Sequence, residues 1–237
     1  MENFRIALTA GHYRDTAGKR CMKSLDPNET REWVLNDRIA DKVEKLLKNY
    51  TGYELIRTDD TTGQKDISLT ARTNAANNFH ADFYLSIHHN AGIDGGTGGG
   101  IVAYIYTQAS EESAQWQKAL YDALIDATGL RGNRYQPLAT ANFYEVRETN
   151  MPAVLLELGF MDSKTDVPII LTEEYADKCA QAIVKVLVEK GKLEKKPQNT
   201  TGRIYRVQVG AYSVKSNAEA MLKKVKEAGF DAFINEY

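Results

Sequence analysis

A run of apolar and small residues that ends in a polar cluster places the strongest constraint on the fold. Residues 83–87 (Phe-Tyr-Leu-Ser-Ile) have the composition of a buried strand, and His88, His89 and Asn90 follow at once. Open α/β sheets bind their ligands at the carboxyl ends of strands. Histidine is the commonest metal ligand and a frequent general base. The run therefore predicts a buried strand that carries chemistry at its end.

Strand and helix patterns alternate along the chain through residue 189. Because such alternation is typical of βαβ units, we expect an α/β fold with a central, mostly parallel sheet flanked by helices on both faces. Apolar runs predict the other strands, at residues 4–8, 53–58, 101–106 and 152–157. Helical periodicity predicts helices at residues 29–48, 68–77, 111–128 and 173–189.

The composition changes near residue 190. Residues 191–203 are charged and polar, with one Pro and two Gly, which predicts a linker. Residues 204–237 follow a strand, helix, strand pattern and predict a small C-terminal β-α-β segment. We therefore expect a catalytic domain at residues 1–190 and a second segment at residues 204–237. From Glu189 onward there are ten Lys or Arg and six Asp or Glu, so this part of the chain carries a net charge of +4. This positive charge fits either a solvated linker or contact with an anionic polymer.

Composition and cysteine spacing argue against several classes of protein. The net charge of −2 gives no reason to expect nucleic-acid binding, and no apolar run is long enough to span a membrane. Residues 1–8 lack the apolar core of a secretory signal, so we expect synthesis in the cytoplasm without a signal peptide. Cys21 and Cys179 lie far apart and outside any CxxC motif, which predicts free thiols.

Four side chains at the ends of predicted elements could meet at one edge of the sheet. His12 follows the first strand, Glu32 lies near the start of the first helix, and His88 ends the central strand. Two histidines and one glutamate with an open fourth position form a common catalytic zinc site. Glu157 ends another apolar strand, where a carboxylate is costly to bury without a partner, and it fits a general base.

Each of these residues also has a purely structural interpretation. His12 could bond to its own turn, Glu32 could be a charge at a helix N-terminus, and His88 could be a core histidine with satisfied hydrogen bonds. His89 follows His88 on an extended segment, so its side chain should point to the opposite face and serve a structural role. The spacing alone does not decide between these interpretations.

Several motifs, in a fixed order within residues 4–190, identify a family. Together they resemble the zinc-dependent N-acetylmuramoyl-L-alanine amidases of the type 3 group, which are bacterial and phage cell-wall hydrolases. The motifs are Ala10-Gly11-His12, Glu32-Trp33-Val34-Leu35-Asn36, Leu69-x-x-Arg72 with Ala76-Asn77, Ser86-Ile87-His88-His89-Asn90-Ala91, and Met151-Pro152-Ala153-Val154-Leu155-Leu156-Glu157-Leu158-Gly159-Phe160.

The resemblance implies an activity and the residues that perform it. His12, Glu32 and His88 would bind Zn²⁺, and Glu157 would be the catalytic carboxylate. The substrate would be the amide bond between N-acetylmuramic acid and L-alanine in peptidoglycan. We also expect Asn90, Asn142 and Arg147 to contact the substrate at the edge of the site.

The origin and exact reaction stay open at this point. Residues 13–20 lack the Gly-Gly-x-Asp run of many members, which favours the phage-endolysin branch, whose enzymes act on the cell wall after release. An autolysin or a spore-related lysin would fit as well. A zinc peptidase that cuts within the stem peptide could use the same site, and a non-catalytic wall-binding protein could keep the fold.

The C-terminal segment resembles one half of a second family. Residues 205–212, together with the helix and the apolar positions that follow, are similar to the SPOR peptidoglycan-binding repeat, which usually contains two β-α-β halves. Two chains could pair through residues 204–237 and form a homodimer. The segment could equally be a truncated wall-binding module.

Overall fold

A six-stranded sheet forms the centre of the first of two compact units, residues 1–196. The computed structural model describes residues 2–197 and 207–236. The strand order is β3-β1-β4-β7-β5-β6; all neighbours are parallel except β5 and β7. The expected mostly parallel sheet is confirmed. The strands are β1 (Phe4–Ala10), β3 (Tyr53–Arg57), β4 (Phe83–Asn90), β5 (Ile101–Tyr106), β6 (Leu138–Ala141) and β7 (Ala153–Phe160).

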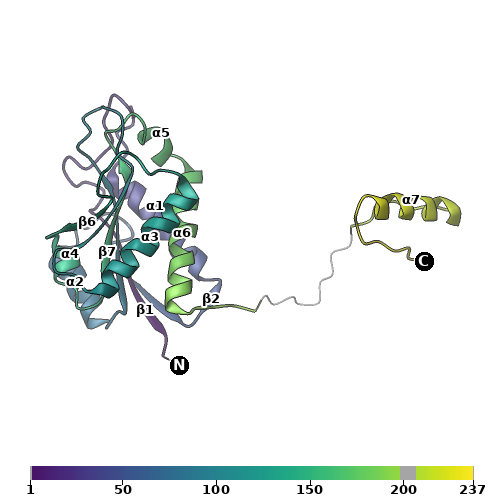
Figure 1. Cartoon of the computed structure of the whole chain (residues 1–237), viewed down its shortest axis with the longest axis horizontal. Coiled ribbons are helices and arrows are strands. Elements are labelled where there is room, and N and C mark those ends of the chain that lie inside the picture. Colours follow the sequence, from purple (N-terminus) through teal and green to yellow (C-terminus); the bar gives the residue numbers. More distant parts are fainter. Residues whose placement is uncertain (1, 198–206, 237) are drawn as a thin grey trace. The chain divides into compact units, whose positions relative to one another are not determined.

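Helices cover both faces of this sheet (Figure 1). Helices α1 (Glu32–Leu47), α3 (Glu111–Thr128) and α6 (Glu173–Gly191) pack on one face, and α2 (Leu69–Asn78) and α4 (Tyr144–Arg147) pack on the other. The ends of α3 follow from its sequence. Ser110 accepts a hydrogen bond from the backbone N–H of Ser113, and Gly129 ends the helix with a left-handed φ of 70°.

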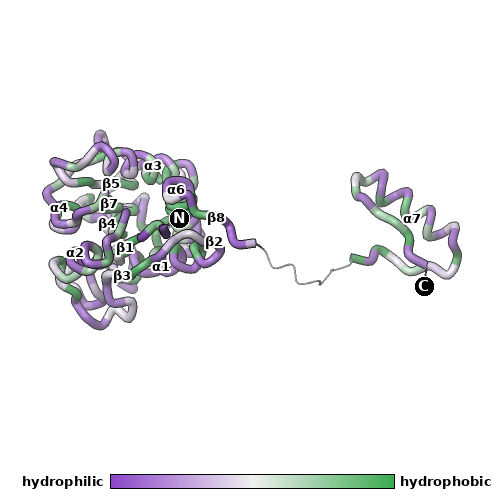
Figure 2. Tube along the Cα trace, turned by 90° about the horizontal axis from the view of Figure 1, so that it is seen from below, coloured by the Kyte–Doolittle hydropathy of each residue, from purple (hydrophilic) through white to green (hydrophobic). Residues whose placement is uncertain are grey.

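The apolar residues of the strands lie between these helical layers, and Figure 2 shows the hydrophobic colour along β1, β4, β5 and β7. Successive residues of β4 point to opposite faces. Leu85 and Ile87 belong to the larger core beneath α1, α3 and α6, whereas Tyr84 belongs to the smaller core beneath α2 and α4. This alternation directs His88 and His89 to different sides of the sheet.

Several short elements were not expected from the sequence. The irregular stretch 129–147 contains β6 and α4, and α5 (Val167–Ile170) precedes α6. A two-stranded sheet joins β2 (Tyr50–Thr51) to β8 (Glu194–Lys195). Strand β8 lies within residues 191–203, which were expected to form a linker. Such elements span only two to four residues, too few for a periodic pattern. Cys21 and Cys179 are buried free thiols, as predicted.

The second unit comprises residues 197–237, and its described part contains one helix, α7 (Lys215–Glu227). The helix lies within the expected range, but residues 207–214 and 228–236 form no strand, in contrast to the predicted β-α-β pattern. Residues 204–206 of that segment lie outside the described residues. A strand needs a hydrogen-bonded neighbour, and the described part of this unit supplies none. Within residues 2–197 and 207–236, no helix has the length and apolar character needed to span a membrane.

Candidate metal centre

His12 follows β1 in a turn that a buried arginine holds. The backbone of His12 has a left-handed φ of 67°. The guanidinium of Arg72 on α2 donates hydrogen bonds to the carbonyl oxygens of His12 and Ala10, each at 2.7 Å, and to Thr9 Oγ1 at 2.8 Å. Arg72 is only 1% exposed. A buried guanidinium with several fixed acceptors restrains the direction in which His12 leaves the strand.

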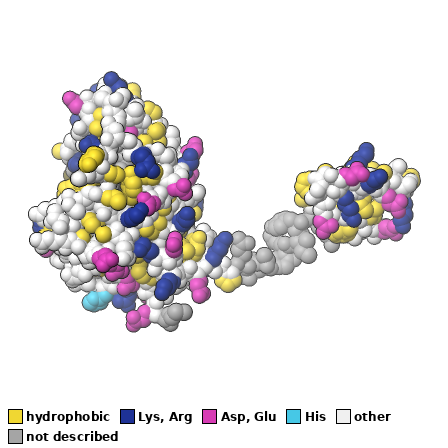
Figure 3. Space-filling view, viewed as in Figure 1, with side chains coloured by type: hydrophobic (Ala, Val, Ile, Leu, Met, Phe, Trp, Pro, Cys, Tyr) yellow, Lys and Arg dark blue, Asp and Glu magenta, His cyan; other side chains and the backbone are white. Residues whose placement is uncertain are grey.

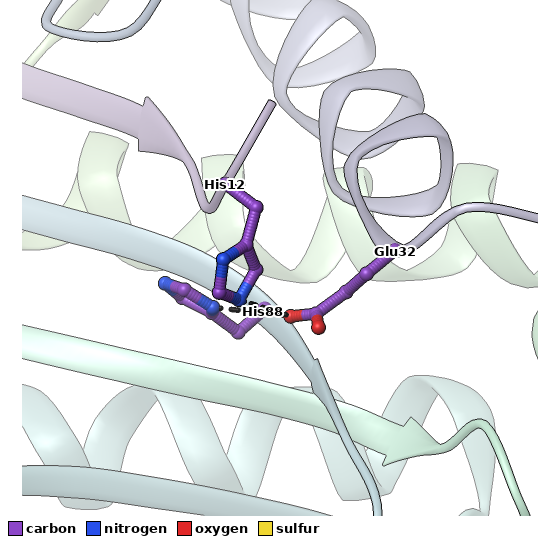
Figure 4. Close-up of side chains that lie close together, drawn as sticks. All are labelled: His12, Glu32 and His88. Carbon is purple, nitrogen blue, oxygen red and sulfur yellow. Dashed lines mark hydrogen bonds and ion pairs between the residues drawn. The ribbon is translucent and has the colours of Figure 1, made fainter. Parts of the chain in front are cut away.

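Glu32 brings a carboxylate to the same point from the first residue of α1. Its Oε1 atom lies 3.3 Å from His12 Nε2 and 3.1 Å from His88 Nδ1 (Figure 4). Lys19 Nζ lies 3.5 Å from the other carboxylate oxygen, and the Glu32 side chain is fully buried. Burial opposes the charge, but the nearby rings of His12 and His88 hold the pKa of Glu32 well below its ordinary value.

His88 reaches the cluster from β4 across Gly11. A Cβ atom on Gly11 would overlap three atoms of the His88 ring, so any larger residue would displace the imidazole. Burial opposes protonation of His88, but the nearby carboxylates of Glu145 and Glu32 raise its pKa to about 10. The ring therefore lies where a positive charge is favoured.

The donor atoms of these three residues fit a metal ion. One ligand atom from each of His12, Glu32 and His88 lies within 4.8 Å of the others. His12 Nε2, Glu32 Oε2 and Glu157 Oε2 are buried without a hydrogen-bond partner among the described residues. Buried polar atoms without partners are rare and mark a place for an ion or water. Two imidazoles and one carboxylate match the donor set of catalytic zinc sites.

Glu157 lies beside this cluster on the neighbouring strand. It is the register partner of His88 in the β4–β7 pair, so both side chains point to the same face. Burial raises the pKa of Glu157 to about 7, a value to which repulsion from Glu32 contributes and which attraction to His88 opposes. A carboxylate with such a pKa can take up and release a proton near neutral pH.

His89 faces the opposite side of β4, as predicted. Its Nδ1 atom lies 2.8 Å from Asn36 Oδ1, and Asn36 Nδ2 donates to the carbonyl of Gly11 at 3.1 Å. Burial lowers the pKa of His89 to about 3, so the ring stays neutral. This contact links α1 to the turn that precedes His12.

The sequence did not single out Glu145 on α4, which lies next to His88. Glu145 is 4% exposed, and its Oε2 atom lies 3.6 Å from His88 Nε2. Tyr84 donates to Glu145 Oε1 at 2.6 Å, and Ser86 donates to Oε2 at 3.4 Å. Tyr84, Ser86 and His88 alternate along β4 and so share one face, a row of polar groups that could have indicated a buried acceptor opposite.

The three residues expected to contact substrate have different surroundings. Asn90 lines an open pocket of about 500 Å³ together with Tyr104, Arg134 and other residues. Arg147 donates to Asn142 Oδ1 at 2.9 Å and to Glu148 Oε1 at 2.6 Å, so these side chains pair with one another. A substrate role for Asn90, Asn142 and Arg147 stays a prediction.

Both parts of this chain are similar in sequence to known protein families. The sequence model of the N-acetylmuramoyl-L-alanine amidase family Amidase_3 matches residues 6–189, and the SPOR domain model matches residues 180–237. The sporulation-specific N-acetylmuramoyl-L-alanine amidase of Bacillus subtilis (strain 168) is 35% identical over 210 residues, which cover 87% of this chain and 77% of the relative.

Two further matches extend this comparison. The endolysin of Bacillus phage SPP1 is 29% identical over 193 residues, 81% of this chain and 67% of the relative. The crystal structure of an N-acetylmuramoyl-L-alanine amidase from Clostridium difficile 630 superposes with a TM-score of 0.71 at 27% identity, covering 80% of this chain and 97% of that one.

Proposed function

The chain belongs to the N-acetylmuramoyl-L-alanine amidase family, and from that premise we propose that it cleaves the amide bond between N-acetylmuramic acid and L-alanine in peptidoglycan at a zinc site. His12, Glu32 and His88 would hold the ion, and Glu157 would be the catalytic carboxylate. The observation that carries this proposal is the meeting of three donor atoms beside Glu157, whose Oε2 atom is buried without a hydrogen-bond partner among the described residues.

Each part of the site has a task in amide hydrolysis. When bound, zinc polarises a carbonyl group and lowers the pKa of water. The Glu157 carboxylate would accept a proton from the attacking water at Oε2 and pass it to the leaving nitrogen. Its pKa near 7 suits both transfers. Arg72 and Gly11 would keep His12 and His88 in place during this exchange.

Replacement of the catalytic carboxylate tests the proposal. We expect Glu157→Gln to keep one zinc ion per chain and to lose about 10²- to 10⁴-fold in turnover on purified cell walls, because it removes proton transfer alone. Glu112, an exposed residue in the first turn of α3, is the matched control when changed to Gln and should retain activity. Full activity in Glu157→Gln would exclude the residue from the reaction.

The released chemical groups separate the amidase from the other candidate functions. An amidase exposes the amino group of L-alanine, which end-group labelling of digested walls detects. A zinc peptidase would expose an amino terminus within the stem peptide. A wall-binding protein without catalysis would release neither group from walls that it binds.

Residues 204–237 are the proposed wall-binding or dimerisation segment, supported by the SPOR match. No residue is buried within the described range 207–236, and Val207, Phe230 and Phe233 are 93%, 68% and 79% exposed. Figure 3 shows hydrophobic side chains beside lysines and acidic residues on this unit.

A homodimer would bury these apolar groups. Light scattering after gel filtration tests it, and a monomer at micromolar concentration would exclude the homodimer.

The proposed place of action is the cell wall, reached after synthesis in the cytoplasm. Both a sporulation-specific amidase and a phage endolysin are relatives, and either kind of enzyme could act on the wall once the cell membrane is opened. We favour an endolysin-like role, because residues 13–20 lack the Gly-Gly-x-Asp run of many members. Bacteria that express the chain should keep growing until the membrane is permeabilised and should then lyse. Lysis of cells with intact membranes would contradict this role.

A further inference from the structure

Glu145 occupies a buried position directly behind the ring of His88. Its two carboxylate oxygens face three polar groups on β4: the hydroxyl of Tyr84, the hydroxyl of Ser86 and the Nε2 atom of His88. A carboxylate is expensive to bury, so three polar groups directed at one carboxylate indicate a built environment rather than a surface charge that happens to be covered.

The two nitrogens of His88 face different carboxylates. Nδ1 lies 3.1 Å from Glu32 Oε1, on the side where His12 also points, whereas Nε2 lies 3.6 Å from Glu145 Oε2. The second distance is longer than a formed hydrogen bond. Nε2 has no other partner among the described residues, although it is buried.

A neutral imidazole carries one proton, and only the other nitrogen can bind a metal. If the proton were on Nδ1, the atom that faces Glu32 and His12 could not act as a ligand. A carboxylate that accepts the proton at Nε2 fixes the other tautomer and also makes the ligand nitrogen more basic.

We propose that Glu145 is a positioning residue that accepts the Nε2 proton of His88 and thereby presents Nδ1 to the metal. Tyr84 and Ser86 hold the carboxylate for this task, because each donates to one of its oxygens. The inference rests on the proposed function in one respect: the site must hold a metal ion. It adds a carboxylate that is neither a ligand nor the catalytic group.

The test compares zinc affinity in Glu145→Gln and Glu148→Gln of the full chain by competition with a chelator. Glu145→Gln keeps the shape of the side chain and removes its charge. We expect its zinc affinity to fall about 10- to 100-fold, the usual effect of removing an outer partner of a metal-bound histidine. Glu148 is exposed on the residue after α4 and pairs with Arg147, so its variant should bind zinc like the wild type.

A second measurement distinguishes positioning from general support of the fold. In the zinc-loaded wild type, the Nε2 proton of His88 should give a slowly exchanging, strongly downfield NMR signal, because it is bonded to a carboxylate. The signal should move upfield in Glu145→Gln, and the urea midpoint of the metal-free variant should stay near that of the wild type. If Glu145→Gln fails to fold, Tyr84→Phe carries the test: it removes one donor to the carboxylate and should weaken zinc binding several-fold.

The outcomes separate this inference from the proposed function. Wild-type zinc affinity together with an unchanged His88 signal in Glu145→Gln would overturn the positioning role and leave the zinc amidase intact. A wild-type chain that binds no zinc would overturn both. Unchanged zinc binding with lost turnover would also overturn the positioning role, because it would assign Glu145 to the reaction itself.

Discussion

His88 and His89 are neighbours in the chain but lie in opposite electrostatic surroundings. His88 lies between Glu32 and Glu145, whereas His89 faces the uncharged amide of Asn36. We therefore expect His88→Ala to lose bound zinc and His89→Ala to keep it, as measured by metal analysis after gel filtration. His89→Ala should still lose about 2 to 4 kcal/mol of stability, because it leaves a cavity beneath α1. Loss of zinc from both variants would contradict the assignment of His88, and not His89, as a zinc ligand.

The buried neutral ring of His89 also makes stability depend on pH. Its pKa is about 3 in the folded chain and near 6.5 when unfolded, so the folded state binds fewer protons between these values. The contribution of the neutral His89 ring to the free energy of unfolding is fully present above pH 6.5 and is lost as the pH falls towards 3. The advantage of the wild type over His89→Gln should shrink by about 2 to 3 kcal/mol between pH 7.5 and 4.5.

Urea unfolding of both metal-free chains at several pH values measures this difference. The titration of His88 and of the carboxylates is common to both chains and cancels to first order in the comparison. A difference that stays constant across the range would show that His89 takes up a proton as readily in the folded chain as in the unfolded chain.

At the scale of elements, Arg72 connects α2 to the end of β1. Its guanidinium contacts the carbonyls of His12 and Ala10 and, through Nε, the carbonyl of Ile67. The single ammonium group of lysine cannot reproduce hydrogen bonds from several guanidinium nitrogens, so Arg72→Lys should lower the free energy of unfolding by about 2 to 4 kcal/mol. It should also weaken zinc binding, because the turn at His12 is released. Arg5→Lys, at a half-exposed site, is the control and should change stability by less than about 0.5 kcal/mol. Equal stabilities for the two variants would contradict this stabilising role of Arg72.

The elements differ in how far their sequence predicts them. Long amphipathic helices such as α3 and buried strands such as β4 have a period that neighbouring residues repeat, so their sequence indicates both type and face. His12, Glu32 and His88 lie at the ends of such elements, and their meeting at one edge follows from a parallel sheet.

Glu145 was missed for a physical reason. It lies on α4, a helix of four residues whose conformation comes from packing against the sheet, and a charged residue in an irregular stretch is usually exposed. The strands expected at the C-terminus have the opposite problem. Their alternating pattern is present, but a pattern without a hydrogen-bonded neighbour does not make a strand.

At the scale of the whole molecule, the chain separates its tasks between two units. Every residue of the proposed zinc centre, together with Glu157, lies in residues 1–196, which contain the buried core. The second unit has no buried residue in its described part and belongs to the range that matches the SPOR domain. The first unit should therefore fold and bind zinc without the second.

A chain shortened after Lys196 tests this division of tasks. It should hydrolyse a soluble muramoyl-peptide at the rate of the full chain, because the reacting groups are unchanged. On insoluble cell walls it should act about 10-fold more slowly or worse, because a second binding unit raises the local concentration of enzyme at its substrate. Sedimentation with purified walls should show a matching loss of bound protein. Equal rates of wall clearing by the two chains would contradict a wall-binding role for the second unit. A loss of activity on the soluble substrate would mean that the second unit supports the catalytic one directly.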